Sequence, residues 1–352
     1  MSAKPTRLGE EIREQPEVAA RLLDRLVPRL PVLREALLGA GSEQVLLVAR
    51  GSSDNAARYA QYLWQSMAGV GVTLATPSLT TVYGRAPDVR RHAVVAVSQS
   101  GRSPDVVAVV EQARAAGRPT LAVTNDPASP LAAAAEHVVD LGAGQERSVA
   151  ATKTYTSSLV ALAVLAAALA DDAPSLQQDL AAVPDALRAA VERTTGLEEA
   201  ASVLKDGNRA VSVGRGLHLS TAHELALKLT ELTGSLVAPY SPADLMHGPV
   251  AAVGPEVPAL LVTPDEQASG SVLEVVPDLV RRRAPVLLLG PATEPVPEGC
   301  LLVGLPAEAE VAGWLSPVTA VVAGQLLAMR VAELRGVDVD HPGDLTKVTL
   351  TR

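Results

Sequence analysis

Short apolar runs alternate with longer helical patterns along most of the chain. Runs rich in valine, leucine and alanine, the signature of buried strands, occur at 44–49, 72–75, 93–97, 119–124 and 137–141. Amphipathic or alanine-rich patterns predict helices at 55–68, 104–116, 129–135 and 153–170. Strands that alternate with helices predict a parallel sheet with helical crossovers, so the fold class is α/β.

The pattern of strands and helices occurs twice. VLLVARGSS at 45–53 resembles AVSVGRGLH at 210–218, which places Gly51 and Gly216 165 residues apart. Two further pairs of apolar runs follow at that offset or one residue beyond it: 94–98 with 259–263, and 119–124 with 285–290. The sequence therefore predicts two copies of one α/β unit.

The repeat and the segments around it divide the chain into five parts. We expect a helical N-terminal segment at 1–42, a first domain at 43–172, a helical linker at 173–196, a second domain at 197–335 and a C-terminal tail at 336–352. The linker holds polar residues and two prolines, Pro174 and Pro184. Residues 316–334 are predicted to be the closing helix of the second copy.

A polar turn after the run at 93–97 predicts the chemistry of the ligand. It reads Ser-Gln-Ser-Gly-Arg-Ser over 98–103, and Pro104 then opens a helical pattern. A helix N-terminus offers unpaired N–H groups and a partial positive charge, which favour phosphate. The candidate phosphate-binding residues are Ser98, Gln99, Ser100, Arg102 and Ser103, with Ser52 and Ser53 in the turn after 44–49.

The second copy lacks this turn. Its equivalent loop reads TPDEQASG at 263–270 and carries two acids, which would repel phosphate. We therefore expect one anion site per chain, in the first domain, and a different contribution from the second.

The helix after Gly216 carries the charged residues that best fit that contribution. Glu224, Lys228 and Glu231 stand at i, i+4 and i+7, on one helical face. On spacing alone, a salt-bridged face open to solvent explains them equally well. Leucines around much of the helix indicate burial instead, and buried carboxylates are suited to proton transfer.

Two further candidates have plain alternatives. His247 precedes Gly-Pro on a predicted turn and could be an ordinary loop histidine, while Lys347 could be an ordinary surface lysine of the tail. The sequence has no Cys/His cluster with metal-ligand spacing and no P-loop. We therefore expect neither a metal nor an organic cofactor.

Composition narrows the class of protein. The net charge of −9 argues against a nucleic-acid partner, and the single cysteine, Cys300, fits a reducing compartment. The N-terminus has no apolar signal segment, and the longest apolar stretch, 159–170, is shorter than the roughly 20 residues of a membrane span. We expect a cytoplasmic protein that does not enter a membrane.

Seven motifs in order resemble the sugar isomerase (SIS) family, and more closely the isomerase half of glucosamine-6-phosphate synthase and stand-alone SIS-type glucosamine-6-phosphate deaminases. They are EIREQPE at 11–17, ARGSS at 49–53, SQSG at 98–101, VAATKTYT at 149–156, ELALKLTEL at 224–232, LMHGP at 245–249 and DVDHPGDLTKVTL at 338–350. The resemblance implies two tandem SIS domains, each a flavodoxin-like, parallel five-stranded sheet between helices, in a homodimer.

The resemblance also implies roles for individual residues. The serines and Gln99 of the two polar turns would hold a sugar 6-phosphate, and the backbone at Val149 and Ala150 would touch the sugar. Glu231, on the helix that also carries Lys228, would move a proton between C1 and C2. His247, contributed across the dimer interface, would open the ring, and Lys347 would close over the substrate.

Three positions depart from the family pattern. Arg102 stands where an acid is usual and adds positive charge beside the phosphate, while Ala151 and Thr230 replace a usual hydroxyl and a usual lysine. The printed sequence contains no glutaminase domain, so glutamine-dependent synthesis is not expected. The leading expectation is conversion of glucosamine 6-phosphate to fructose 6-phosphate and ammonia.

Two alternatives remain open from the sequence. The same site could dehydrate N-acetylglucosamine 6-phosphate or cleave a fructosamine 6-phosphate, because Ala151 and Thr230 leave more room near the sugar. A sensor that binds a sugar phosphate without turnover is the other, although the presence of Glu231, His247 and Lys347 disfavours it.

Overall fold

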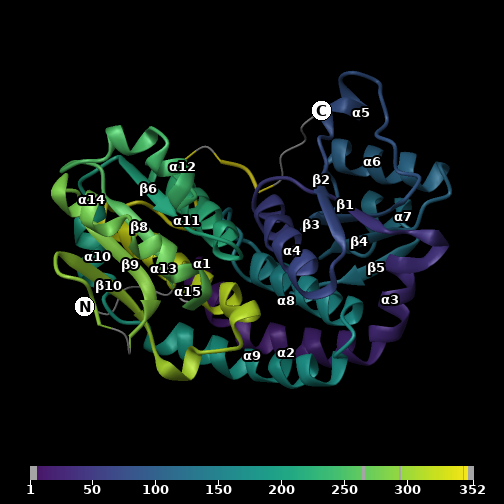
Figure 1. The fold of residues 1–352 in the computed structure, drawn as a ribbon, viewed down its shortest axis with the longest axis horizontal. Helices are drawn as coiled ribbons and strands as arrows, with labels where there is room; N and C mark the ends of the chain where they lie inside the picture. Colours follow the sequence, from purple (N-terminus) through teal and green to yellow (C-terminus); the bar gives the residue numbers. More distant parts are fainter. Residues whose placement is uncertain (1–5, 264–265, 293–294, 344, 348–352) are drawn as a thin grey trace. The chain divides into compact units, whose positions relative to one another are not determined.

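The computed structural model describes residues 6–263, 266–292, 295–343 and 345–347. The chain divides into two compact units, each built on one sheet (Figure 1). The first-sheet unit comprises residues 17–146, 153–181 and 346–352, and the second-sheet unit comprises residues 1–16, 147–152 and 182–345. The domain limits expected from the sequence remain predictions beside this division.

The first sheet is parallel throughout and has the strand order β2-β1-β3-β4-β5. Its strands are β1 (Gln44–Val48), β2 (Gly71–Leu74), β3 (His92–Ser98), β4 (Thr120–Thr124) and β5 (His137–Asp140). The register of its central pair aligns Val45 with Ala93 and Val48 with Ala96. Near-continuous burial of β3 and β4 matches a sheet covered on both faces.

Helices cover both faces of the first sheet (Figure 1). Those of this region are α2 (Gln15–Leu26), α3 (Leu30–Leu38), α4 (Ser52–Ala68), α5 (Ser78–Thr81), α6 (Pro104–Ala115), α7 (Pro130–Ala134) and α8 (Lys153–Leu169). On one face α4 packs against α8, which is buried along its whole length. On the other, Val106, Val109 and Val110 of α6 pack onto strand residues such as Val94.

The second sheet repeats this topology, with the order β10-β9-β8-β6-β7 and only parallel pairs. Its strands are β6 (Arg209–Val213), β7 (Leu236–Tyr240), β8 (Ala259–Val262), β9 (Val286–Pro291) and β10 (Cys300–Leu305). In order of appearance within each sheet, both have the arrangement 2-1-3-4-5 of flavodoxin-like folds. The predicted repeat and the predicted fold class are confirmed.

The helices around the second sheet also form two layers (Figure 1). The region contains α1 (Arg7–Arg13), the part of α9 (Ala173–Arg193) from residue 182 on, α10 (Leu197–Leu204), α11 (His218–Thr233), α12 (Pro242–Met246), α13 (Glu266–Leu273), α14 (Val276–Arg281) and α15 (Ser316–Leu334). One layer packs α15 against both α10 and α11. In the other, Leu245, Val272 and Leu279 of α12, α13 and α14 pack onto Val211 and Val213 of β6.

Short 3₁₀ turns join several of these elements, and the predicted element limits were close. The turns are η1 (Val27–Arg29), η2 (Gly39–Gly41), η3 (Pro249–Ala252), η4 (Ala307–Ala309) and η5 (Gly313–Leu315). The main correction concerns the helix expected from residue 55, which begins at Ser52. Gly51, with φ of 55°, makes the sharp bend after β1 that lets the helix begin earlier.

One helical segment of the described chain, Gly313–Leu334, is long and apolar enough to span a membrane. Its most apolar stretch is 83% buried, and α15, its main part, packs against α10 and α11. Length and composition are weak grounds for a membrane span when a helix lies inside a protein core.

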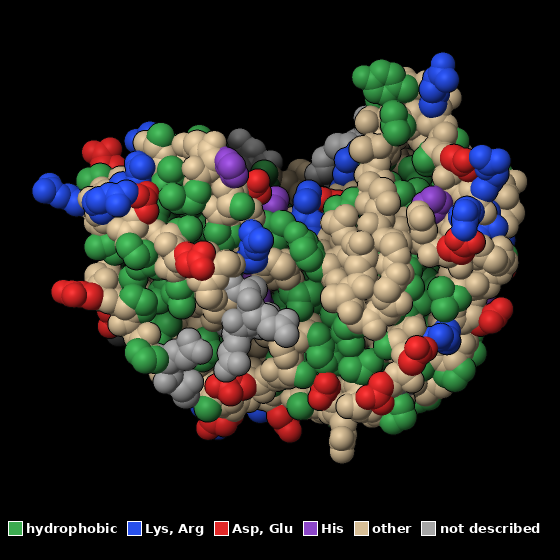
Figure 2. All heavy atoms as spheres, in the orientation of Figure 1, with side chains coloured by type: hydrophobic (Ala, Val, Ile, Leu, Met, Phe, Trp, Pro, Cys, Tyr) green, Lys and Arg blue, Asp and Glu red, His purple; other side chains and the backbone are tan. Residues whose placement is uncertain are grey.

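A small apolar patch is exposed on the first-sheet unit. Leu79 of α5 and Val82 and Tyr83 just after it are 41%, 66% and 70% exposed. Figure 2 shows hydrophobic side chains projecting at the upper right, where Figure 1 places α5. This patch covers α5 and the residues just after it, and none of its residues belongs to the buried core under α6.

Candidate functional site

The polar turns of the first copy lie at the carboxyl edge of the first sheet, where the strand order reverses. Ser52 and Ser53 begin α4 directly after β1, and the turn at 98–103 joins the neighbouring strand β3 to α6. Since α4 and α6 lie on opposite faces of the sheet, their first turns lie on either side of the carboxyl ends of β1 and β3. Ligands of open α/β sheets bind at such a reversal point.

Internal hydrogen bonds shape the turn at 98–103. The Gly101 N–H donates to Ser98 Oγ over 3.1 Å, and the Arg102 N–H lies 3.4 Å from Ser100 Oγ. Gly101 has a φ of 61°, and a Cβ there would lie 2.1 Å from Ser129 Oγ, so only glycine fits. Ser98 and Ser100 each accept one N–H here, and a serine hydroxyl can also donate a hydrogen bond. The turn is therefore shaped before any ligand arrives.

Both helices that start at this edge begin without a side-chain cap. Gly51 occupies the N-cap position of α4, and Ser103 occupies that of α6 but makes no capping hydrogen bond. Uncapped first turns leave backbone N–H groups for an anion. Arg102 adds charge at the rim, where its guanidinium is 61% exposed and lies 3.4 Å from Asp126.

An ion pair that the sequence analysis missed ties the two turns together. The Nε and Nη2 atoms of Arg50, from the turn after β1, each lie 2.6 Å from Oδ2 of Asp105 in the first turn of α6. The Asp105 side chain is 1% exposed, whereas that of Arg50 is 48% exposed. The sequence could have indicated this pair only through the position of an arginine beside one polar turn and an aspartate beside the other.

The charged residues of α11 form a connected group that runs from the protein interior to its surface. Glu224 is 0% exposed, and its Oε1 lies 3.5 Å from Nζ of Lys228, which is 1% exposed. Lys228 also forms a hydrogen-bonded ion pair with Glu231, whose side chain is 26% exposed. The solvent-face explanation is wrong for Glu224 and Lys228, and Glu231 is the accessible end of the group.

The first copy supplies an internal control for this face. Subtracting the repeat offset of 165 from Glu224, Lys228 and Glu231 gives Tyr59, Leu63 and Ser66 of α4. Tyr59 and Leu63 are 0% exposed, and burial raises the pKa of the Tyr59 phenol. The corresponding helix face is thus an apolar packing surface in one copy and a buried charge group in the other.

The start of α11 has a buried histidine where the start of α4 has a serine. His218, which corresponds to Ser53, is 1% exposed, with Nε2 2.8 Å from Ser316 Oγ and Nδ1 3.3 Å from Thr221 Oγ1. Burial lowers the pKa of His218 to about 3, so the ring is neutral. The two acids expected to repel phosphate are Asp265 and Glu266, and Asp265 and the side chain of Glu266 lie outside the described residues.

The segment expected to touch the sugar is held from α1. The carboxylate of Glu11, itself buried, accepts hydrogen bonds from the N–H groups of Arg147 and Ser148. Val149, which follows, is half-buried and Ala150 is buried. Because these backbone groups are fixed by a buried carboxylate, Glu11 is a further residue of this segment, signalled only by its place in EIREQPE.

Lys347 of the tail is also anchored. Its Nζ lies 2.7 Å from Oε2 of Glu146, a carboxylate that is 0% exposed. Oε2 also accepts from Thr154 Oγ1 over 2.6 Å, and Oε1 accepts from the Thr154 N–H over 3.1 Å. The tail residues after Lys347 lie outside the described residues, as does Asp344.

His247 stands in the turn after α12 and is exposed. The following Gly248 has a φ of 143°, a backbone conformation that side chains disfavour. The imidazole therefore projects from a sharply bent turn within the second-sheet unit, whereas Ser52, Ser53 and the turn at 98–103 belong to the first-sheet unit.

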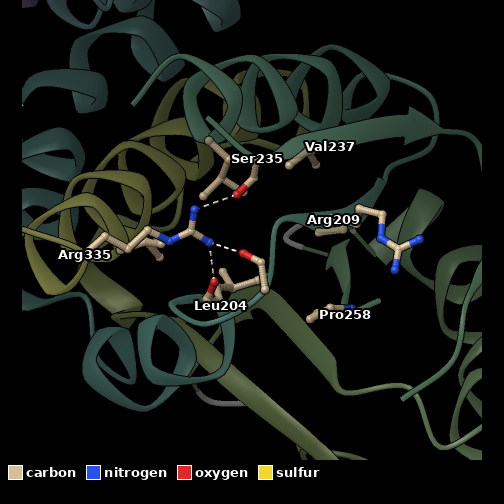
Figure 3. Close-up of a pocket in the computed structure, with 10 residues that line it drawn as sticks. Leu204, Arg209, Ser235, Val237, Pro258 and Arg335 are labelled. Atoms are coloured by element: carbon tan, nitrogen blue, oxygen red, sulfur yellow. Dashed lines mark hydrogen bonds between the residues drawn. The ribbon is translucent and has the colours of Figure 1, made fainter. Parts of the chain in front are cut away.

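A small pocket in the second-sheet unit is occupied by a structural arginine, Arg335 (Figure 3). It lies where β6 and β7 begin, at the amino edge of the second sheet. The Arg335 guanidinium fills it with five hydrogen bonds, to the carbonyls of Leu204, Lys205, Gly207 and Thr233 and to Ser235 Oγ. All five N–H donors of an arginine are thereby used, which leaves none for a ligand. Burial lowers the pKa of Arg335.

Within the described part of the chain, no group of three or more histidine, cysteine, aspartate or glutamate side chains could hold a metal ion. Cys300 is free, half-buried and at the start of β10, and burial raises the pKa of its thiol. A raised thiol pKa lowers the thiolate fraction and hence the reactivity of this cysteine.

Comparisons with known proteins agree with the arrangement. The model of the SIS domain family matches residues 40–168 and 203–330. A candidate phosphosugar isomerase from Silicibacter pomeroyi is 33% identical, with a TM-score of 0.85, and the match covers 96% of this chain and 100% of that one. Glucosamine-6-phosphate deaminase from Thermotoga maritima shares the fold, with 21% identity, a TM-score of 0.73 and coverage of 98% and 100%.

Curated relatives extend beyond the matched region. Glutamine–fructose-6-phosphate aminotransferase from Methanothermobacter thermautotrophicus is 32% identical over 96% of this chain, which corresponds to 56% of that protein. The enzyme of the same name from Thermococcus kodakarensis is 32% identical over 96% of this chain and 57% of its own length. The chain thus spans about half the length of the curated relatives it matches.

Proposed function

The chain belongs to the SIS domain family, and we propose that it isomerises a hexosamine 6-phosphate, converting glucosamine 6-phosphate and water to fructose 6-phosphate and ammonia. The observation that carries this proposal is the charge group of α11, whose accessible member is Glu231. A buried ion pair is a weak source of stability. Its presence in α11, at positions where the equivalent helix α4 has the core residues Tyr59 and Leu63, therefore favours a chemical role.

The phosphate end of the substrate fits the first-sheet edge. Ser52, Ser53, Ser98, Gln99, Ser100 and Ser103 would surround the phosphate, with Arg102 at the rim. Support comes from the preshaped turn at 98–103 and from the uncapped starts of α4 and α6. Binding the non-reacting phosphate positions the sugar, and such positioning lowers the barrier of the chemical step.

Proton transfer at the other end of the sugar would use Glu231. His247, donated by a second copy of the chain in a homodimer, would assist ring opening; its exposure on a sharp turn is in keeping with that role. Glu231 would then take the proton from C2 and a proton would be delivered to C1. Water adds to the resulting C2 imine and expels ammonia. Lys228 holds the Glu231 carboxylate in place.

The direct test is ammonia release. The protein is incubated with glucosamine 6-phosphate, and ammonia and fructose 6-phosphate are measured against a Glu231→Gln variant. We expect equal amounts of the two products from the wild-type chain and almost none from the variant. Wild-type release no greater than that of the variant would rule out this reaction.

A bulkier C2 substituent is the second candidate. Thr230 is short and directs its hydroxyl to the carbonyl of Ala226 over 2.8 Å, and Ala151 has no functional group, so neither reaches toward a C2 amine. This favours dehydration of N-acetylglucosamine 6-phosphate or cleavage of a fructosamine 6-phosphate as the alternative. Mass spectrometry across a panel of these phosphates separates the reactions. Binding without any turnover would identify a sensor instead.

A further inference from the structure

Lys347 is fixed to the first-sheet unit through one buried carboxylate, that of Glu146. Residues 182–345 belong to the second-sheet unit, and the chain passes into the first-sheet unit at Thr346. The ion pair of Lys347 Nζ with Glu146 Oε2, at 2.7 Å, is therefore made one residue after the tail enters the first-sheet unit.

This contact differs from a surface ion pair in its burial. The Glu146 side chain is 0% exposed and that of Lys347 is 23% exposed, whereas pairs such as Arg193–Glu308 are more than half exposed on both sides. A buried carboxylate that loses its cation retains an uncompensated charge, which is costly. The carboxylate is itself fixed by the N–H and the hydroxyl of Thr154 at the start of α8. The Glu146 carboxylate is thus held by Thr154 independently of Lys347.

The position of Glu146 in the chain links the anchor to the sugar. It directly precedes Arg147 and Ser148, whose N–H groups Glu11 holds, and stands three residues before Val149. One short segment therefore carries both the anchor of the tail and the backbone expected to touch the sugar.

We propose that Glu146 is a positioning residue that locks the C-terminal tail and fixes the Lys347 ammonium as a stationary cation of the active site. Resting on the proposed function, this assigns Lys347 to electrostatic stabilisation of the negative charge that develops on the sugar oxygen when C2 loses its proton. A fixed cation needs no reorganisation during the reaction, which is why its position matters for the rate.

The test uses the full chain and four variants: Glu146→Gln, Lys347→Met, the double variant, and Glu198→Gln as a control that breaks the exposed Arg330 pair on α10. Hydrogen exchange of the peptide covering 336–347 is measured without ligand, and kcat and KM for ammonia release are measured separately. Glu146→Gln should speed tail exchange several-fold and lower kcat about tenfold, with KM nearly unchanged. Lys347→Met should match it, and the double variant should lose no more than either.

Wild-type tail exchange in Glu146→Gln would overturn the proposal, as would kcat losses that multiply in the double variant. If the wild-type chain releases no ammonia, the proposed function fails, while the exchange measurement still decides whether Glu146 locks the tail. Should Glu146→Gln fold poorly, Lys347→Met tests the same contact from its more exposed side, and unchanged tail exchange there would equally contradict the lock.

Discussion

The two copies have the same strand order and differ at equivalent positions on the same elements. In the first copy, the helix after the first strand begins with Ser52 and Ser53 and continues with an apolar face that includes Tyr59 and Leu63. In the second, the equivalent helix begins with the buried His218 and carries buried charges at the matching face. If the proposed function holds, the duplicated scaffold separates the binding of a ligand from the chemistry performed on it.

The stability cost of each difference supports this division. Burying Glu224 and Lys228 where Tyr59 and Leu63 suffice for packing gains little or nothing in stability. The serines of the first copy are likewise poor helix formers. Residues that the fold does not need are those that a ligand or a reaction can use.

The largest expected effect is on turnover. Glu231→Gln should lower kcat for ammonia release by about 10²–10⁴-fold, because an amide cannot accept the C2 proton. Affinity for the 6-phosphate should stay within a few-fold. The matched control is Ser66→Ala at the equivalent position of α4, which should keep full turnover. An equal loss in both variants would show that this face serves only packing.

The buried pair on α11 predicts an effect on stability. Lys228→Met should lower the free energy of unfolding by about 3–5 kcal/mol, because Glu224 is left buried without its cation. Combining it with Glu224→Leu should restore most of that loss without restoring turnover. Urea unfolding and kinetic assays check the two parts. A double variant as unstable as the single one would mean that the charges themselves hold the fold.

The serine turn predicts an effect on binding. Ser100→Ala should weaken binding of fructose 6-phosphate by about ten- to hundredfold, the value of one or two hydrogen bonds to a charged group. Calorimetric titration measures it. Thr263 stands 165 residues after Ser98, directly after β8, so Thr263→Val is the control in the second copy and should leave affinity unchanged. Similar losses from both would place phosphate contacts in the second copy too.

The buried His218 of the second copy predicts that the stability of the protein depends on pH. Its folded-state pKa of about 3 lies below the ordinary value near 6.5, so below pH 6.5 the unfolded chain binds a proton that the folded one does not. Stability should therefore fall by about 2 kcal/mol from this group between pH 7 and pH 5. His218→Asn should remove that part of the slope, whereas His341→Asn, at an exposed site, should not. An unchanged slope in His218→Asn would contradict the buried neutral ring.

Arg102 predicts the smallest effect. Its guanidinium is mostly exposed and pairs loosely with Asp126, and exposed pairs contribute about 0–1 kcal/mol. Arg102→Ala should weaken 6-phosphate binding less than about fivefold and reduce the dependence of binding on salt. A far larger loss would make Arg102 a direct phosphate ligand.

Sequence patterns predicted the architecture well because the strands are short apolar runs and the repeat supplied two independent views of each. The start of α4 was missed because Ser52 and Ser53 favour turns, whereas the bend at Gly51 allows the helix to begin there. Charge partners distant in the chain could not be read from spacing. Arg50 meets Asp105 across 55 residues, Glu146 meets Lys347 across 201, and only the fold brings each pair together.

The burial of side chains was the other property that the spacing of residues in the sequence could not predict. Glu224, Lys228 and Glu231 have the same helical spacing whether the face is exposed or buried, and only the structure shows that Glu224 and Lys228 are buried while Glu231 is partly exposed. The hydrogen bond of the buried His218 also depends on a residue of another helix, Ser316.

The most direct test of this division of labour is deuterium incorporation at C2 of glucosamine 6-phosphate in heavy water, followed by NMR together with ligand binding. The account predicts that Glu231→Gln binds the 6-phosphate with near wild-type affinity and incorporates no deuterium. It also predicts that Ser100→Ala incorporates deuterium at a near-normal rate once the ligand is saturating. Deuterium incorporation by Glu231→Gln at the wild-type rate would contradict the account.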